Sequence, residues 1–366
     1  MKIAIAREAL LKPLQLVSGV VERRQTLPIL ANVLLSIDRD GLTLTGTDLE
    51  VEMQARTSGS SVDTGDITLS ARKFMDICRT LPEQAMLEIS VENERALIRS
   101  GKSRFTLATL PAADFPSVDP IEAPFSFSLA QRDMKRLIEQ TQFSMAHQDV
   151  RYYLNGLMVE IGKGALRAVA TDGHRLAMCE VAAEVDIAEP RQVIVPRKGV
   201  LELARLLDES ESMVEVQLGS NHIKVVFPDV TFTSKLIDGR FPDYERVMPA
   251  GGNRVVECGR ETLRQAFVRA SVLSNEKFRG IRLQFGRNLL RATVHNPEQE
   301  EAEEELEVEY AGEEFEIGFN VSYFLDALGA IKAERVKIVL TDANSSCLIQ
   351  GDDDAHCSYV IMPMRL

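Results

Sequence analysis

The chain has 366 residues, of which 45% are hydrophobic and 27% charged, and its formal net charge is -13 at pH 7. This composition is typical of an ordinary soluble globular protein of two or three domains. No run reaches the ~18 consecutive apolar residues of a membrane-spanning helix, and the N-terminal segment lacks the apolar core and cleavage site of a signal peptide, so we expect a cytoplasmic protein.

Six helices are expected along the chain, because apolar residues recur at helical spacing, as Leu10, Leu14 and Val17 do near the N-terminus. The expected helices cover residues 7–21, 71–81, 130–146, 197–209, 259–276 and 320–334. Between them, apolar and polar residues alternate, as in Leu42 and Leu44 against their neighbours. This alternation is typical of strands.

The order of helix, strands, helix, strands is repeated three times. Landmark residues recur at a constant interval of 124 residues: Asn32, Gly156 and Gly280, then Asp48, Asp172 and Asn296. This interval is too long for a solenoid repeat and long enough for a domain. The sequence therefore predicts three α+β domains, residues 1–123, 124–244 and 245–366, each with two helices packed on one face of an antiparallel sheet.

The negative charge argues against a nucleic-acid partner only if it is evenly spread, since phosphate binding normally needs a basic surface. The six expected helices carry more Lys and Arg than Asp and Glu, so the rest of the chain is the more acidic part. Such helices suit a surface that faces phosphate without gripping it. They are equally compatible with helix faces that are simply solvated.

Two expected strand edges carry opposite charge. In the first copy a basic hairpin is interleaved with apolar residues, and in the third copy an acidic run follows a strand pattern. One sign of charge along an edge is a common protection against aggregation, but complementary edges also indicate head-to-tail docking of two chains. The expected dimer-interface residues are Lys73, Arg95, Lys102, Arg104, Phe105, Leu107, Val272, Leu273, Glu298, Glu300, Glu301 and Glu304.

A search for catalytic and metal-binding motifs finds no phosphate-binding loop, no dinucleotide fingerprint and no zinc-protease motif, so we expect no catalytic residue, cofactor or metal. The most enzyme-like segment is 171–175, TDGHR. Its aligned positions, Asp48-Leu49 and Asn296-Pro297, favour a structural turn over a general base. The cysteines have no CxxC spacing and are expected to be buried, reduced thiols: Cys78, Cys179, Cys258, Cys347 and Cys357.

The motifs LPILANVLL, LTGTDLE, QFSMAHQDVRYYLNG, ATDGHRLA, VIVPRKG, NPEQEEAEE and the terminal MPMRL resemble the beta subunit of bacterial DNA polymerase III, the replicative sliding clamp. The resemblance covers essentially the whole chain. It implies a head-to-tail homodimeric ring of six similar domains, with helices lining the hole and sheets outside, that encircles duplex DNA. It also implies that short peptide segments of polymerases, the clamp loader and repair proteins bind between the second and third copies.

The resemblance assigns residues to both roles. The expected DNA-facing residues are Arg24, Arg72, Gln148, Tyr152, Tyr153 and Lys198. The expected groove residues are Leu154, Thr171, Gly173, His174, Arg175, Leu176, Pro242, Arg246, Val247, Phe278, Asn320, Tyr323, Ser346, Val360, Met362, Pro363, Met364, Arg365 and Leu366. Asn344 departs from the family pattern, in which this position is often apolar. The competing hypotheses are an enzyme that uses Asp172 and His174, and a protein scaffold that never encircles DNA.

Overall fold

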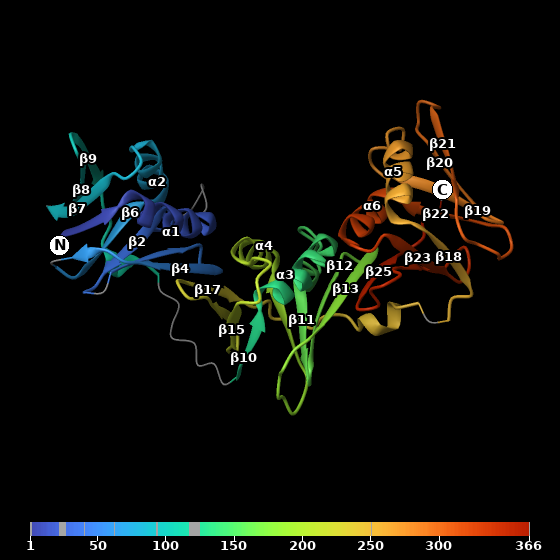
Figure 1. Ribbon diagram of the computed structural model, residues 1–366, viewed down its shortest axis with the longest axis horizontal. Coiled ribbons are helices and arrows are strands. Elements are labelled where there is room, and N and C mark those ends of the chain that lie inside the picture. The colour runs from blue at the N-terminus through green and yellow to red at the C-terminus, as the bar shows by residue number, and fades with distance from the viewer. Residues whose placement is uncertain are drawn as a thin grey trace. The chain divides into compact units, whose positions relative to one another are not determined.

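The computed structural model describes residues 2–21, 27–39, 41–61, 63–92, 94–116, 125–249 and 251–365 (Figure 1). The chain divides into two compact units, and both include part of the second copy. Unit 1 is Met1–Gln131 with Leu201–Leu236, and unit 2 is Arg132–Val200 with Ile237–Leu366. Among the described residues, no helix has the length and apolar character needed to cross a membrane.

The six expected helices are confirmed, and each begins within one residue of its expected start. They are α1 (Arg7–Val20), α2 (Ala71–Thr80), α3 (Gln131–Glu139), α4 (Arg197–Leu206), α5 (Arg260–Ser271) and α6 (Val321–Ala330). All six end earlier than predicted. Side chains explain two of these ends: the Thr141 hydroxyl donates to the Leu137 carbonyl at 2.6 Å, and the Ser274 hydroxyl donates to the Ser271 carbonyl at 2.7 Å. Both bonds satisfy carbonyls that a longer helix would have used itself.

Unit 1 contains two sheets. The first has the strand order β5 (Ser60–Ser61), β1 (Lys2–Ala6), β7 (Met86–Glu92), β8 (Arg95–Ser100) and β9 (Ser103–Ala108). The second has the order β10 (Phe125–Ala130), β15 (Met213–Leu218), β16 (His222–Val226), β17 (Val230–Lys235), β4 (Val51–Thr57), β3 (Leu42–Thr47), β2 (Asn32–Ile37) and β6 (Gly65–Ser70).

The helices of the first copy pack on the second sheet of unit 1. Helix α1 buries Leu10, Leu14 and Val17 and contacts β3, β4 and α2. Gly46 on β3 makes this approach possible, because a Cβ there would lie 2.4 Å from the Val17 carbonyl oxygen. The helix therefore lies closer to the sheet than any larger residue at 46 would permit.

Unit 2 also contains two sheets. The larger has the order β14 (Arg191–Pro196), β11 (Gly156–Gly162), β12 (Ala165–Thr171), β13 (Arg175–Ala182), β25 (Cys357–Ile361), β24 (Cys347–Gly351), β23 (Arg335–Leu340) and β18 (Arg254–Gly259). The smaller has the order β21 (Glu301–Glu307), β20 (Leu289–His295), β19 (Gly280–Gly286) and β22 (Phe315–Asn320). Helix α5 packs on β20, β21 and α6.

Strands of one copy pair with strands of the next. In unit 1, β4 of the first copy pairs with β17 of the second, with Met53 opposite Phe232. In unit 2, β13 of the second copy pairs with β25 of the third, with Leu176 opposite Val360. The described strand pairs are antiparallel, which agrees with the α+β fold class. The three domain ranges stay a prediction: Ala123 lies outside the described residues, and Tyr244 opens the 3-10 helix η5 (Tyr244–Val247).

Candidate functional site

The C-terminal segment of unit 2 is held between two strands. The backbone N–H of Met362 donates to the carbonyl of His174 at 2.9 Å, just beyond the pairing of β25 with β13. Two residues later, Met364 donates its N–H to the carbonyl of Gly318 on β22 at 2.8 Å. The last residues thus run from the second copy's sheet edge to the third copy's smaller sheet.

A cluster of buried apolar residues lies where the second and third copies meet in unit 2. We call this set the apolar cluster: Ala146, Leu154, Met158, Val169, Leu176, Ile194, Phe241, Tyr244 and Val360. Tyr153, Met178 and Met248 pack against it and are only partly buried. Met362, the next residue but one after Val360, is 41% exposed. The C-terminal segment therefore passes directly from buried apolar positions to exposed ones.

The segment 171–175 forms a tight turn that borders the apolar cluster. The Asp172 carboxylate accepts the backbone N–H groups of His174 and Arg175 at 2.9 and 3.0 Å, and the Thr171 hydroxyl donates to the Arg175 carbonyl at 2.6 Å. Gly173 has a φ of +88°, which a glycine adopts without strain.

The first copy has the same turn. Asp48 accepts the N–H groups of Glu50 and Val51, and the Thr47 hydroxyl donates to the Val51 carbonyl. Leu49, at the position equivalent to Gly173, has a φ of +78°. The interpretation of these segments as structural turns is confirmed.

A loop from the second copy lies against this turn. The guanidinium of Arg151 bonds to the Asp149 carboxylate at 2.9 Å and to the Asp172 carbonyl at 3.3 Å. The hydrogen bonds from Arg151 lower the pKa of Asp149 to about 2. A Cβ at Gly173 would lie 2.9 Å from the Arg151 guanidinium nitrogens. Arg151 and Gly173 therefore fit together, and the loop that carries Gln148 is fixed to the turn.

Arg175 is held by the second and third copies at once. Its guanidinium bonds to Asp172 at 3.1 Å, to Asp326 on α6, and to the Phe143 carbonyl at 2.6 Å. It also lies 4.6 Å from the centroid of the Tyr323 ring, and burial raises the pKa of that tyrosine. With these partners, Arg175 connects β13 to α6 and supports the turn.

Tyr244 connects the apolar cluster to a partly buried charge network that sequence reasoning missed. Its hydroxyl accepts a bond from Arg167 at 2.6 Å, and Arg167 also bonds to Glu180 at 2.6 Å and Glu160 at 3.1 Å. Burial raises the pKa of Tyr244. Glu160, Arg167 and Glu180 lie opposite one another on β11, β12 and β13. The sequence signal that could have revealed this network is the alternation of opposite charges on neighbouring strands.

The expected groove residues are only partly brought together. The turn, the C-terminal segment, Tyr323 and the apolar cluster are linked by the contacts above, and Asn320 caps α6 by accepting the Ser322 N–H at 2.9 Å. Pro242, Arg246 and Val247 lie in or just before η5 and are exposed, and Ser346 just precedes β24. Asn344 donates its backbone N–H to Asp342. Leu366 lies outside the described residues.

A separate pocket of about 400 Å³ lies beside the end of the C-terminal segment. Phe278, Met364 and Arg365 line it together with Asn275, Arg282 and His295. Phe278 is 55% exposed. The structure thus places three expected groove residues around this pocket of the third copy.

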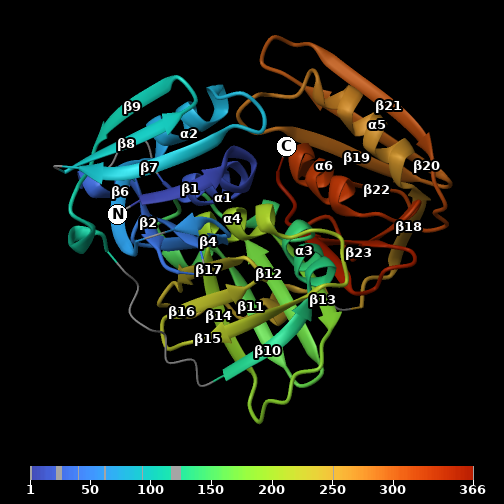
Figure 2. The ribbon, with the colours of Figure 1, turned by 60° about the vertical axis from the view of Figure 1, so that its left-hand side comes forward.

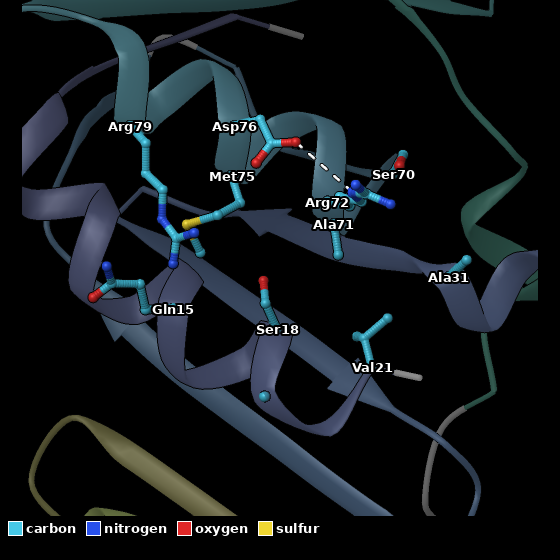
Figure 3. A pocket seen from close by; sticks show the side chains of 11 residues that line it. Gln15, Ser18, Val21, Ala31, Ser70, Ala71, Arg72, Met75, Asp76 and Arg79 are labelled. Carbon is cyan, nitrogen blue, oxygen red and sulfur yellow. Dashed lines mark ion pairs between the residues drawn. The ribbon is translucent and has the colours of Figure 1, made fainter. Parts of the chain in front are cut away.

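The expected DNA-facing residues lie in both units. In unit 1, Arg72 lines a pocket of about 580 Å³ between α1 and α2 and pairs loosely with Asp76 at 3.9 Å (Figure 3). Arg79 reaches from α2 toward α1, and the buried hydroxyl of Ser18 has no hydrogen-bond partner among the described residues. This pocket therefore combines the cations of Arg72 and Arg79 with a buried hydroxyl that has no partner among the described residues. Arg24 lies outside the described residues.

In unit 2, three of the remaining DNA candidates lie in one loop, residues 148–153, and the fourth lies on α4. Gln148 is exposed with a φ of +56°, and Tyr152 is exposed with its ring 5.8 Å from that of Tyr153. Tyr153 packs on the apolar cluster, so the two tyrosines together reach from the exposed surface to the core. Lys198 is the second residue of α4.

The expected dimer-interface residues lie on or near two sheet edges, on α2 and just after α5. β9 is the edge of its sheet in unit 1, and β21 is the edge of its sheet in unit 2 (Figure 2). On or beside β9, the side chains of Arg95, Lys102 and Arg104 form no ion pair within the described part of the chain. Phe105 and Leu107 are half-buried on β9. Lys73 lies on α2 and is exposed.

The acidic edge is already partly paired within the chain. Arg269 on α5 bonds to Glu304 through both carboxylate oxygens at 2.8 and 2.6 Å, and this lowers the pKa of Glu304. Glu301 lies 3.7 Å from His295. Glu298 and Glu300 are exposed in the segment before β21. Val272, just after α5, is 76% exposed, whereas the neighbouring Leu273 is half-buried.

Comparison with known proteins finds one family along the whole chain. The N-terminal, central and C-terminal domain models of the DNA polymerase III beta subunit match residues 1–119, 128–243 and 245–365. The chain is 56% identical to the beta sliding clamps of Pseudomonas aeruginosa and Escherichia coli, covering 100% of each chain.

Solved structures agree with this assignment. The DNA polymerase III subunit beta of Pseudomonas aeruginosa superposes with a TM-score of 0.98 at 56% identity, covering 100% of both chains. A sliding clamp of Bartonella birtlesii bound to griselimycin superposes with a TM-score of 0.97 at 37% identity, again over 100% of both chains. Pol III beta of Caulobacter crescentus superposes with a TM-score of 0.95 at 38% identity over the same share.

Proposed function

The chain belongs to the DNA polymerase III beta subunit family, and we propose that two copies close head to tail into a ring around duplex DNA. Its function is that of a sliding clamp, a non-catalytic processivity factor of this polymerase. In the proposal, the three domains of each copy, residues 1–123, 124–244 and 245–366, supply six similar units. The ring works in the cytoplasm.

The continuation of sheets from one copy to the next is the observation that carries the proposal. β4 pairs with β17, and β13 pairs with β25, so each junction inside the chain is made by edge strands of neighbouring copies. β9 is one edge strand of the first copy, and β21 is one edge strand of the third copy. If two chains formed a junction of the same kind, β9 of one chain would pair with β21 of the other. Such heterologous contacts close into a ring when the rotation per unit fits.

Charge supports this pairing of edges. The cations on and beside β9 have no ion-pair partner in the described part of the chain, while β21 carries five glutamates at positions 301, 303, 304, 305 and 307. An unpaired edge strand exposes backbone N–H and C=O groups, and complementary charge on two edges favours one partner over others. The acidic edge of one chain is therefore better matched to the basic edge of a second chain than to another acidic edge.

DNA is held in this proposal mainly by the closed ring, since a chain with a net charge of -13 is not suited to tight phosphate binding. Arg24, Arg72, Gln148, Tyr152, Tyr153 and Lys198 are proposed to meet the DNA backbone. Arg72 is well placed for this, because its side chain is 82% exposed and its pairing with Asp76 is loose. Contacts of this kind position DNA without fixing one sequence or one register.

Partners are proposed to bind through short peptides in a groove lined by the apolar cluster, the 171–175 turn and the C-terminal segment. The exposed side chains of Met362 and Val247 border buried apolar residues, which is how a pocket for an apolar anchor is built. Polymerase subunits, the clamp loader and repair proteins are the expected partners, and one groove per chain would let two of them bind one ring.

The experiment is retention on DNA of different topology. The protein is loaded by its clamp loader onto nicked circular DNA, and half of the sample is then cut once with a restriction enzyme. We expect the protein to stay on the circle at high salt and to leave the linear form, because electrostatic binding alone weakens with salt on both forms. Equal loss from circular and linear DNA would rule out a ring.

A further inference from the structure

Two cysteines from different copies lie side by side in unit 2. The thiol of Cys357 donates a hydrogen bond to the sulfur of Cys179 at 2.7 Å. The two residues are paired partners on β13 and β25, the strands that join the second copy to the third. Both are buried, free thiols. They are 178 residues apart in the sequence.

Their backbone position suits a disulfide. The next pair along, Glu180 with His356, is joined by a hydrogen bond from the Glu180 N–H to the His356 carbonyl at 2.9 Å. Since hydrogen-bonded and non-bonded pairs alternate in an antiparallel ladder, Cys179 and Cys357 form a non-bonded pair. In such a pair the Cα atoms lie about 4.5 Å apart, within the range of about 4.4 to 6.8 Å that a disulfide requires.

The surroundings activate one thiol. The hydrogen bond from Cys357 lowers the pKa of Cys179, and Arg136 acts in the same direction. Arg136 also lies 3.8 Å from the sulfur of Cys357 and pairs with Asp354 at 2.8 Å. Its side chain is 41% exposed, so the cation beside the two buried thiols is itself in contact with solvent. A cation beside a thiol favours the thiolate, which is the reactive form.

We propose that Cys179 and Cys357 are a site of reversible oxidation, at which a peroxide links β13 to β25 through a disulfide. The Cys179 thiolate attacks one peroxide oxygen, the O–O bond breaks, and the hydroxide that leaves takes up a proton to become water. The Cys357 sulfur then attacks the Cys179 sulfenic acid, the S–O bond breaks, and a second water leaves with the Cys357 proton. Two thiols are oxidised and the peroxide is reduced by two electrons.

The bond would join the second and third copies covalently beside the C-terminal segment. The sulfurs need to move roughly 0.7 Å closer to reach the S–S bond length of about 2.0 Å. This is a small local shift on paired strands. A dithiol would reverse it by exchange. The inference does not depend on the ring or on the peptide groove.

The test counts thiols in the full-length protein. The protein is treated with hydrogen peroxide or with diamide, denatured, alkylated with N-ethylmaleimide and weighed intact. We expect five alkylated cysteines before treatment, three afterwards, and five again after dithiothreitol. Proteolysis without reduction should give one linked pair of peptides, which contain Cys179 and Cys357.

Single variants make the assignment specific. Cys179→Ala and Cys357→Ala should each keep four alkylated thiols after treatment, whereas Cys78→Ala, a matched loss of a buried cysteine on α2, should fall from four to two. Retention of all five thiols with both oxidants would overturn the proposal. So would a linkage to Cys347, or conversion of one cysteine to a sulfinic acid without a linkage.

Discussion

The backbone N–H of Met362 donates to the carbonyl of His174 at 2.9 Å, so the C-terminal segment continues the strand pairing that joins the second copy to the third. Met362 nevertheless remains 41% exposed. The backbone of this segment is therefore fixed while its side chains stay available. This is the arrangement expected for the wall of a peptide-binding groove.

We expect deletion of Met364 to Leu366 to abolish binding of a clamp-binding peptide and to leave the dimer intact. The single change Met362→Ala should weaken the peptide about 30-fold, since anchoring residues in such pockets are worth about 2 kcal/mol or more. Fluorescence anisotropy with a labelled peptide measures both effects. Met213→Ala, which removes an exposed methionine from β15, is the matched control and should bind normally. Unchanged affinity after the deletion would place the peptide elsewhere.

Gly173→Ala should destabilise the protein more than Gly164→Ala does. Both glycines have positive φ, +88° and +80°, so both changes incur the same backbone strain of about 1 to 2 kcal/mol. A methyl group at 173 would also lie 2.9 Å from the Arg151 guanidinium, whereas nothing lies within 4 Å of a Cβ at 164. Urea unfolding measures the difference.

Arg151→Ala tests the cause of that difference. In an Arg151→Ala background, Gly173→Ala and Gly164→Ala should have nearly equal effects on the free energy of unfolding, because the clash is gone. A difference that persists in this background would show that Arg151 is not what limits residue 173.

Acid should loosen the loop that carries Gln148. The pKa of Asp149 is lowered from 3.8 to about 2 by its bonds to Arg151. A carboxyl group with a lowered pKa in the folded state stabilises that state above its unfolded pKa, and this contribution disappears as the pH falls from about 4 to 2. The protection factors of the amides of residues 147–151, which correct for the intrinsic pH dependence of hydrogen exchange, should therefore fall over that range.

Asp149→Asn serves as the comparison for the acid experiment. This variant should show low protection factors in the loop already at pH 5 and little further change down to pH 2. If the loop amides of the unchanged protein have the same protection factors at pH 5 and pH 2, the Asp149 and Arg151 pair does not hold the loop.

Local sequence patterns predicted much of this structure. Apolar periodicity located six helices, and the aligned positions Asp48 and Asp172 indicated a turn, because both features depend on residues close in the chain. The junctions between copies were not predictable in this way. The pairing of β4 with β17, and the 2.7 Å contact of Cys179 with Cys357, depend on which strand edges meet after folding. Alternation along a strand does not specify its partner.

The anchoring of Arg175 was missed for a related reason. The residue was predicted as a groove residue, but it bonds to Asp326 and to the Phe143 carbonyl, which come from elements far away in sequence. Arg269 and Glu304 are a second example: the acidic run was visible in the sequence, but its partner on α5 was not. Long side chains select partners by proximity in the fold, which sequence spacing does not reveal.

The dimer is expected to depend on apolar contacts more than on charge. Phe105 and Leu107 lie half-buried on the edge strand β9, and Val272 is 76% exposed after α5. Full burial of each large apolar side chain is worth roughly 1.5 to 3 kcal/mol, whereas an exposed ion pair contributes about 0.2 to 1 kcal/mol. We therefore expect the double variant Val272→Ala, Leu273→Ala to be a folded monomer at concentrations at which the unchanged protein is a dimer.

Analytical ultracentrifugation at several concentrations and salts measures this, with circular dichroism to confirm folding, since Leu273 is half-buried in its own chain. Val150→Ala removes a valine that is 96% exposed in a loop outside the proposed interface, and this variant should remain a dimer.

Arg104→Glu should weaken the dimer less than the double alanine change, and more at low salt than at high salt, because salt screens exposed charges. Adding Glu301→Lys should restore part of the loss if the two edges meet. Glu304→Lys should restore less, because Glu304 already bonds to Arg269 of its own chain. A double alanine variant that stays dimeric at nanomolar concentration would contradict this interface.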